Sequence, residues 1–227
     1  MYLFSSLKPA DITQSQLIKY CVRITTGFIC LVGLCIVFID QPLTSQFKDD
    51  DWLWLLAREV THVGLFTNYF IPAFLIWFGA QILLRWKKSK NRQRLKLIAT
   101  QALWLMYCLL FSGLWTHILK FSFGRQRPKI SPLFDPYEFQ FFNTHWDFHS
   151  LPSGHSQVVF TVATFLAFMF PRFKYGFYSV AFVMGFTRVM TRDHFFSDVL
   201  AGLAVGHLST IIMLFWLYGR HSQNFKT

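Results

Sequence analysis

Residues 97–119 read LIATQALWLMYCLLFSGLWTHIL, a run of 23 residues without one Asp, Glu, Lys or Arg. A helix of this length spans the roughly 30 Å hydrocarbon core of a bilayer. The rest of the chain has the same character: 53% of the 227 residues are hydrophobic, only 15% are charged, and 28 are Phe. This composition is too apolar and too aromatic for an ordinary soluble domain. We therefore expect an integral membrane protein.

Five further segments match residues 97–119 in apolar character and approach it in length. Together the predicted transmembrane helices fall at about residues 20–39, 63–84, 97–119, 156–171, 175–192 and 195–217. The fourth and fifth are short and separated by only a few residues, which predicts a tight helical hairpin. The sequence contains no internal repeat and no low-complexity linker, so we expect one all-α domain over residues 1–227, an integral membrane bundle of six transmembrane helices.

A shorter helix is predicted between the first two spans. Residues 49–51 are three aspartates, and the sequence WLWLL follows at residues 52–56. Acidic residues favour a helix N-terminus, and Trp and Leu on a short helix favour the membrane interface. We expect an interfacial helix here; an extension of the second span is the alternative.

The formal net charge of +11 is unevenly distributed. Seven cations and no acid lie at residues 85–96, between two apolar segments, where a cytoplasmic loop carries its charge. The side of the membrane that holds this run and both termini receives fourteen of the 22 Lys and Arg residues. We therefore expect cytoplasmic termini and no nucleic-acid partner; a patch that binds anionic lipid is an alternative role for the basic run.

Three blocks of polar residues lie where apolar segments meet the opposite, outer side. They are Lys120 with Arg127 and Pro128, the tetrapeptide Pro152-Ser153-Gly154-His155, and Arg188 with His194 and Asp198. Polar residues at such positions are costly unless they bind or react with something.

Together the three blocks have the chemistry of an anion site. A helix that begins near His155 points the backbone N–H groups of residues 153–155 at an anion, and Gly154 permits a close approach. The cations Lys120, Arg127 and Arg188 would neutralise phosphoryl oxygens.

The third block adds a reactive group. His194 and Asp198 are four residues apart, so on a helix they share one face. The carboxylate can then hold one ring nitrogen while the other ring nitrogen faces a substrate.

In order and spacing, the three blocks resemble the signature of the type 2 phosphatidic acid phosphatase family, K-x6-RP, PSGH and SR-x5-H-x3-D. The motifs cover residues 120–198, and the single departure is Thr187, where the family usually has Ser. The resemblance implies that His194 is a nucleophile that forms a phosphohistidine and that Asp198 orients it. It also implies that His155 is the general acid and later activates water. The implied phosphate-binding residues are Lys120, Arg127, Ser153, Gly154 and Arg188, with no metal or other cofactor.

The same resemblance implies a lipid phosphatase whose partners are the bilayer and a membrane lipid that carries a phosphate or diphosphate. Candidate substrates are phosphatidic acid, phosphatidylglycerol phosphate, undecaprenyl diphosphate and lipid A 1-phosphate. The implied location is a bacterial plasma (inner) membrane with the active site on the periplasmic face. A lipid-to-lipid phosphotransferase using the same site and a non-catalytic lipid-binding protein are the alternatives.

Several other polar residues have less defined roles. We expect packing or hydrogen-bonding roles for His62, His117 and His207, and substrate-side positions for Arg125, Lys129 and Arg192. His145, Asp147 and His149 form a loose metal-binding pattern; a role of the two histidines in gating or in contact with a lipid headgroup is the alternative.

Overall fold

The computed structural model describes residues 13–48, 51–86 and 91–223. Its α-helices are α1 (Gln14–Phe38), α2 (Asp40–Thr44), α3 (Trp52–Thr61), α4 (Thr67–Trp86), α5 (Arg92–Phe123), α6 (Gly154–Met169), α7 (Lys174–Met190) and α8 (Phe196–Gln223). Short 3-10 helices lie at η2 (His62–Gly64), η3 (Pro128–Ile130), η4 (Trp146–Phe148) and η5 (Pro171–Phe173). The described residues form no strand, so the predicted all-α class is confirmed.

Each of the six predicted spans overlaps one long helix, namely α1, α4, α5, α6, α7 or α8. Within the described residues, four segments are long and apolar enough to cross a membrane: Gln14–Phe38, Trp52–Arg85, Arg92–Phe123 and Phe196–Gly219. Gly154–Met169 is a shorter apolar helix. The multi-pass architecture is confirmed, and crossings by α6 and α7 stay predictions.

The predicted short helix between the first two spans exists as α3. The Asp51 side chain caps it by accepting a hydrogen bond from the Trp52 N–H at 2.8 Å. Trp52, Leu55 and Leu56 are exposed, so α3 presents apolar side chains outward. Its position in the membrane interface stays a prediction. Residues 49–50 of the acidic run, residues 87–90 of the basic run and the terminal Lys8 and Lys226 lie outside the described residues.

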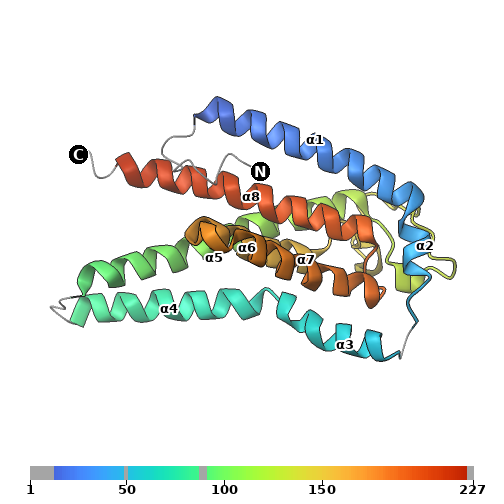
Figure 1. The fold of residues 1–227 in the computed structure, drawn as a ribbon, viewed down its shortest axis with the longest axis horizontal. Coiled ribbons are helices and arrows are strands. Elements are labelled where there is room, and N and C mark those ends of the chain that lie inside the picture. Colours follow the sequence, from blue (N-terminus) through green and yellow to red (C-terminus); the bar gives the residue numbers. More distant parts are fainter. Residues whose placement is uncertain (1–12, 49–50, 87–90, 224–227) are drawn as a thin grey trace.

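The helices form an elongated bundle in which α6 is central (Figure 1). It packs against α5, α7 and α8, and most of its residues are buried. In contrast, α1 packs mainly along α8 and buries little of its own surface. The start of α1, the end of α8 and the adjoining ends of α4 and α5 lie at one end of the bundle (Figure 1). The opposite end holds α2, α3 and the 124–153 segment, which contains part of each of two polar blocks.

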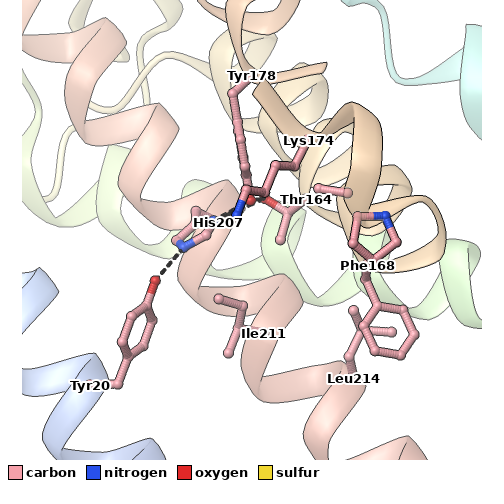
Figure 2. A pocket seen from close by; sticks show the side chains of 10 residues that line it. Tyr20, Thr164, Phe168, Lys174, Tyr178, His207, Ile211 and Leu214 are labelled. Atoms are coloured by element: carbon pink, nitrogen blue, oxygen red, sulfur yellow. Dashed lines mark hydrogen bonds between the residues drawn. The ribbon is translucent and has the colours of Figure 1, made fainter. Parts of the chain in front are cut away.

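One buried polar cluster joins the helices away from that segment. His207 on α8 forms hydrogen bonds to the Tyr20 hydroxyl at 2.9 Å and to the Thr164 and Tyr178 hydroxyls at 3.0 and 3.2 Å (Figure 2). The cluster lines a cavity of about 60 Å³. Both ring nitrogens are therefore satisfied, which confirms the predicted hydrogen-bonding role of His207.

Candidate active site

The end of α5 determines where the first polar block lies. Gly124 follows the last helical residue with a φ of 55°, and a Cβ at this position would lie 1.7 Å from the Gln140 carbonyl oxygen. Only glycine fits such a helix end. The turn leaves Lys120 in the last helical turn of α5 and places Arg127 in the segment that crosses the end of the bundle.

All three polar blocks meet in one pocket of about 490 Å³. The members of the three polar blocks that line it are Lys120, Arg127, Gly154, His155, Arg188 and His194. Its other lining residues are Gly64, Leu65, Phe66, Leu109, Leu110, Gly113, Leu114, Thr116, His117, Trp146, Gln157 and Val158. The pocket therefore has a cationic floor, and its walls include apolar side chains of α5 and of residues 65–66, between η2 and α4. His117, for which a packing role was expected, is exposed and lines this pocket.

Two cations of the floor are held by backbone carbonyl oxygens. Lys120 donates from Nζ to the His149 carbonyl. Arg127 donates to the Trp146 and Asp193 carbonyls, both at 3.3 Å, and its guanidinium lies 4.3 Å from the Trp146 ring. Burial and the nearby Arg188 charge lower the pKa of Arg127 from its ordinary value. Only 5% of Lys120 and 2% of Arg127 are exposed, so these charges are concentrated in the pocket.

The third cation is paired with an acid. Arg188 Nη2 lies 2.8 Å from Asp193 Oδ2, and its Nη1 donates to the Thr61 hydroxyl at 3.0 Å. Among the described residues, Arg188 Nε is a buried donor without a hydrogen-bond partner. Although burial alone would raise the pKa of Asp193, the charges of Arg188 and Lys129 hold it well below its usual range. Asp193 is thus a fixed anion beside the cations.

The second polar block opens α6. The Ser153 side chain caps this helix by accepting from the Ser156 N–H, and the Ser153 N–H donates to the Asp198 carbonyl at 2.9 Å. The prediction that the Ser153 N–H points at an anion is therefore wrong, because the first turn of α8 already occupies it. The N–H groups of Gly154 and His155 begin α6, where helix geometry leaves N–H groups without intrahelical partners.

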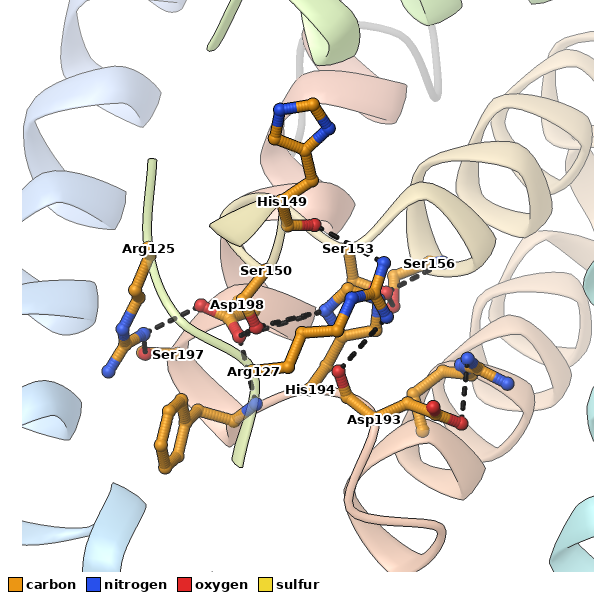
Figure 3. A network of polar contacts seen from close by, with 12 residues as sticks. Arg125, Arg127, His149, Ser150, Ser153, Ser156, Asp193, His194, Ser197 and Asp198 are labelled. Atoms are coloured by element: carbon orange, nitrogen blue, oxygen red, sulfur yellow. Dashed lines mark hydrogen bonds and ion pairs between the residues drawn. The ribbon is translucent and has the colours of Figure 1, made fainter. Parts of the chain in front are cut away.

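The histidine of the third block is fully enclosed, with 2% of His194 exposed. It precedes α8, so it does not share a helical face with Asp198 as predicted. His194 Nδ1 lies 3.7 Å from Asp198 Oδ2, too far for a direct hydrogen bond. The Ser150 hydroxyl lies between them: it donates to Asp198 Oδ2 at 2.6 Å and is 3.4 Å from His194 Nδ1 (Figure 3).

Electrostatics keep His194 neutral. Burial lowers its pKa well below the ordinary histidine value, and the charges of Arg127 and Lys120 act in the same direction against the opposing effect of Asp198. A neutral imidazole carries a lone pair on one ring nitrogen, which is the nucleophilic form.

Arg125 does not lie in the substrate-side position that was predicted for it. This residue has no exposed surface; its Nη1 lies 2.6 Å from Asp198 Oδ1 and its Nη2 lies 2.8 Å from Asp40 Oδ2. The predicted substrate-side position is wrong, because the guanidinium lies behind the Asp198 carboxylate. Asp40 and Ser150 were missed because neither belongs to a motif with fixed spacing.

The remaining predicted positions are peripheral. Lys129 is 44% exposed in its side chain and pairs with Asp193 at 2.7 Å, and the Arg192 guanidinium lies 5.4 Å from the Phe134 ring. His145 pairs with Asp147 at 3.3 Å, whereas His149 Nε2 bonds to the Asn143 carbonyl at 2.9 Å. The described residues contain no group of three or more His, Cys, Asp and Glu side chains that could hold a metal ion.

Two solved structures share this fold. The crystal structure of Aquifex aeolicus LpxE superposes with a TM-score of 0.51 at 21% identity, covering 78% of this chain and 94% of that one. The crystal structure of a transmembrane PAP2 type phosphatidylglycerolphosphate phosphatase from Bacillus subtilis gives 0.54 at 23% identity, with coverages of 89% and 96%.

Comparison of sequences identifies the family. Residues 101–222 match the PAP2 superfamily model. A lipid A 1-phosphatase of Rhizobium etli is 34% identical over 203 residues, which cover 86% of this chain and 84% of the relative. A lipid A 1-phosphatase of Rhizobium johnstonii is 36% identical over 155 residues, which cover 65% of this chain and 64% of the relative, just under two thirds of its length. The chain therefore belongs to the PAP2 superfamily and is a multi-pass membrane phosphatase.

Proposed function

We propose that this protein removes the 1-phosphate of lipid A through a phosphohistidine at His194. The observation that carries the proposal is the pocket in which buried cations surround a buried, neutral histidine beneath apolar walls. The two Rhizobium relatives, both lipid A 1-phosphatases, favour this lipid among the four candidates.

The walls support a lipid substrate. Leu65, Phe66, Leu110 and Leu114 line the pocket, and the three leucines are exposed. A substrate with its tails in the bilayer and its phosphate at the headgroup level matches apolar walls above a cationic floor.

In the first step, His194 Nε2 attacks phosphorus, and the bond from phosphorus to the lipid oxygen breaks. His155, in its imidazolium form, donates a proton to that leaving oxygen and becomes neutral. Lys120, Arg127 and Arg188 neutralise the charge on the phosphoryl oxygens, and the N–H groups at the start of α6 provide directed donors. The unpartnered Nε of Arg188 is a donor that a phosphoryl oxygen would satisfy.

In the second step, His155 accepts a proton from water, and the water oxygen attacks the phosphohistidine. The bond from phosphorus to Nε2 breaks, inorganic phosphate leaves, and His194 returns to its neutral form. No metal or other cofactor takes part in either step.

Ser150 holds the reactive tautomer in this scheme. His194 donates its Nδ1 proton to the Ser150 hydroxyl oxygen, and that hydroxyl donates to Asp198 at 2.6 Å. A proton fixed on Nδ1 leaves the lone pair on Nε2, the nitrogen that attacks. The carboxylate thus acts on the histidine through a serine.

We place the protein in a bacterial inner membrane with cytoplasmic termini and the pocket on the periplasmic face. The basic run at residues 85–96 supports this orientation, because such runs stay in the cytoplasm. A single cysteine introduced at position 93 should be inaccessible to a membrane-impermeant thiol reagent in intact cells of a variant without its native cysteines. Labelling from outside would reverse the assigned orientation.

The function is tested with purified protein in detergent and four lipids: lipid A, phosphatidic acid, phosphatidylglycerol phosphate and undecaprenyl diphosphate. Lipid A should lose its 1-phosphate with the highest kcat/KM, in the presence of excess EDTA, and inorganic phosphate should equal the lipid product. Preference for another lipid would refute the substrate. Complete loss of activity with EDTA that metal restores would refute the mechanism, and transfer of phosphate to a second lipid would identify a phosphotransferase.

The intermediate is tested by rapid quenching in alkali, which preserves phosphohistidine, with substrate labelled at the phosphate. Wild-type protein and the exposed-histidine control His62→Ala should carry label, and His194→Ala should carry none. His155→Gln should retain any label it acquires for longer, because water is no longer activated. Label of equal amount on His194→Ala would remove this residue as the nucleophile.

A further inference from the structure

A cluster of three fully buried charged side chains lies behind the proposed nucleophile. Arg125 contacts Asp40 at 2.8 Å on one side and Asp198 at 2.6 Å on the other, and none of the three side chains is exposed. The Ser197 hydroxyl accepts from Arg125 at 2.7 Å and donates to Asp40, and Figure 3 shows Ser197 and Asp198 beside the Arg125 guanidinium. The cluster joins α2, the segment after α5 and the first turn of α8.

Hydrogen bonds fix the orientation of every member. The Pro136 carbonyl accepts from Arg125 Nε at 3.1 Å and from its Nη2 at 2.9 Å, and the guanidinium lies 4.4 Å from the Phe195 ring. Asp40 Oδ1 also accepts from the Ser197 N–H at 2.9 Å. Consequently the guanidinium has little freedom to rotate, and it presents one nitrogen to each carboxylate.

The two oxygens of the Asp198 carboxylate have different partners. Oδ1 faces Arg125, whereas Oδ2 accepts from the Phe195 N–H at 2.9 Å and from the Ser150 hydroxyl at 2.6 Å. Because Arg125 holds Oδ1, Oδ2 stays aimed at Ser150 and, through it, at His194.

The charges explain why a second carboxylate is present. Arg125 alone would form a neutral pair with Asp198, and a neutral pair gives little stabilisation to positive charge that develops on His194. Asp40 shares the guanidinium, so with both acids ionised the cluster of two carboxylates and one guanidinium carries a net charge of −1 in a buried site, where charge acts strongly. Burial raises the pKa of Asp40, and the Arg125 charge opposes that rise. Buried ions of this kind are costly, so a functional role is expected.

We propose that Asp40 and Arg125 are positioning residues that orient the Asp198 carboxylate and keep its negative charge available to His194. They contact neither the phosphate nor the reacting atoms. The proposal rests on the proposed function, because it assigns them a role in phosphorylation of His194.

The test compares Asp40→Asn and Arg125→Lys with wild type, using the lipid that wild type hydrolyses best. Asn keeps the size of Asp and removes its charge, and Lys keeps the charge of Arg but has no fork that serves two carboxylates. The rate of phosphoenzyme formation should fall roughly 10- to 100-fold in each variant, which is typical for residues that hydrogen-bond to a functional group and fix its orientation. KM should change less than twofold. The matched control Asp135→Asn removes an exposed acid from the same end of the molecule and should change neither value.

A purely structural role would give a different pattern. The variants would then lose yield or thermal stability, while the folded fraction formed the phosphoenzyme at the wild-type rate, and that result would overturn the proposal. Should either variant fail to fold, Ser197→Ala removes one hydroxyl from the cluster and leaves all three charges. It should slow phosphoenzyme formation several-fold at unchanged KM, and a wild-type rate would likewise overturn the proposal.

The variant His194→Ala distinguishes failure of the proposed function from failure of the role proposed for Asp40 and Arg125. If wild type hydrolyses no lipid, or if His194→Ala stays active, the proposed function fails and the role of the cluster fails with it. If wild type is active, His194→Ala is inactive and Asp40→Asn forms the phosphoenzyme at the wild-type rate, only the role of the cluster fails.

Discussion

Replacement of Ser150 by Ala tests the most specific feature of the site. The substitution removes the hydroxyl that donates to Asp198 at 2.6 Å and lies 3.4 Å from His194 Nδ1. Alanine leaves the 3.7 Å gap between the imidazole and the carboxylate unbridged. His194 can then rotate or place its proton on Nε2, and in either case the attacking lone pair is lost from the pocket.

The size of the effect follows from these contacts. A buried hydrogen bond to a charged group contributes about 1.5–3 kcal/mol. If that energy is used to hold the reactive tautomer, its loss slows phosphorylation roughly 10- to 100-fold. A shift of His194 toward Asp198 would close the gap and recover part of the energy, so about tenfold is the expected minimum. KM should stay within about twofold, because Ser150 lies behind the histidine and away from the phosphate.

The assay is steady-state phosphate release together with the alkali-quenched phosphoenzyme, for wild type, Ser150→Ala and a matched control. Ser131→Ala is the control, because it removes a buried hydroxyl that bonds to the Asp135 N–H, outside the pocket. Ser150→Thr, which keeps a hydroxyl, should recover part of the rate. The reasoning is refuted if Ser150→Ala retains a kcat within twofold of wild type, or if its entire defect lies in KM.

Three further predictions follow from single contacts. Burial and the charges of Arg127 and Lys120 hold the pKa of His194 well below its ordinary value, so the imidazole stays neutral as the pH falls. The value of kcat/KM, corrected for ionisation of the substrate, should therefore decline only well below pH 6.5. A decline centred at pH 6.5 would contradict this prediction. A Cβ on Gly64 would lie 2.9 Å from His155 Cδ2, so Gly64→Ala should lower kcat roughly 10- to 100-fold. The control Gly79→Ala, where no atom lies within 4 Å of the added Cβ, should leave kcat unchanged. Equal kcat values for the two variants would show that the contact between Gly64 and His155 does not matter for the reaction. Tyr20→Phe removes the 2.9 Å hydrogen bond to His207 and should lower the free energy of unfolding in detergent by about 1 kcal/mol, with kcat unchanged. A lower kcat at unchanged stability would contradict this and connect the His207 cluster to the active site.

The sequence predicted the helices well because membrane spans leave a direct signal. Each long apolar run corresponds to one helix, although α1 begins at Gln14 and not near residue 20. That difference has a local cause: Thr13 and Gln16 form a capping box before the apolar run starts, and polar residues can extend a helix beyond the bilayer core. The family prediction was confirmed because motifs with fixed spacing are specific even in a single sequence.

Contacts between distant residues left no such signal. Asp40 and Arg125 are 85 residues apart, and no periodicity connects an acid after the first span with an arginine after the third. Arg125 lies two residues before Arg127 and was predicted on the substrate side, but its guanidinium pairs with Asp40 and Asp198, whereas Arg127 lines the pocket. The four-residue spacing of His194 and Asp198 suggested direct contact, but α8 begins only at Phe196, so the helical geometry behind that prediction does not apply.

In the proposed function, the chemistry and the choice of lipid reside in different parts of the pocket. In the proposed mechanism every phosphate monoester uses the same nucleophile and cations, and backbone contacts hold both: the His194 N–H donates to the Arg188 carbonyl at 3.1 Å, and Arg127 donates to the Asp193 carbonyl at 3.3 Å. Substitution in this floor should therefore impair all lipids alike. In the proposed function the walls contact the remainder of the substrate, and there the apolar side chains of residues 65–66 and of α5 line the pocket. Because an apolar wall rejects a misfitting group by only about 1–3 kcal/mol per methylene, discrimination among lipids requires several wall residues acting together. Changes at Leu65, Leu110 and Leu114 should thus alter the order of preferred lipids while leaving the rate of dephosphorylation of the phosphohistidine unchanged, since that step begins after the lipid has left.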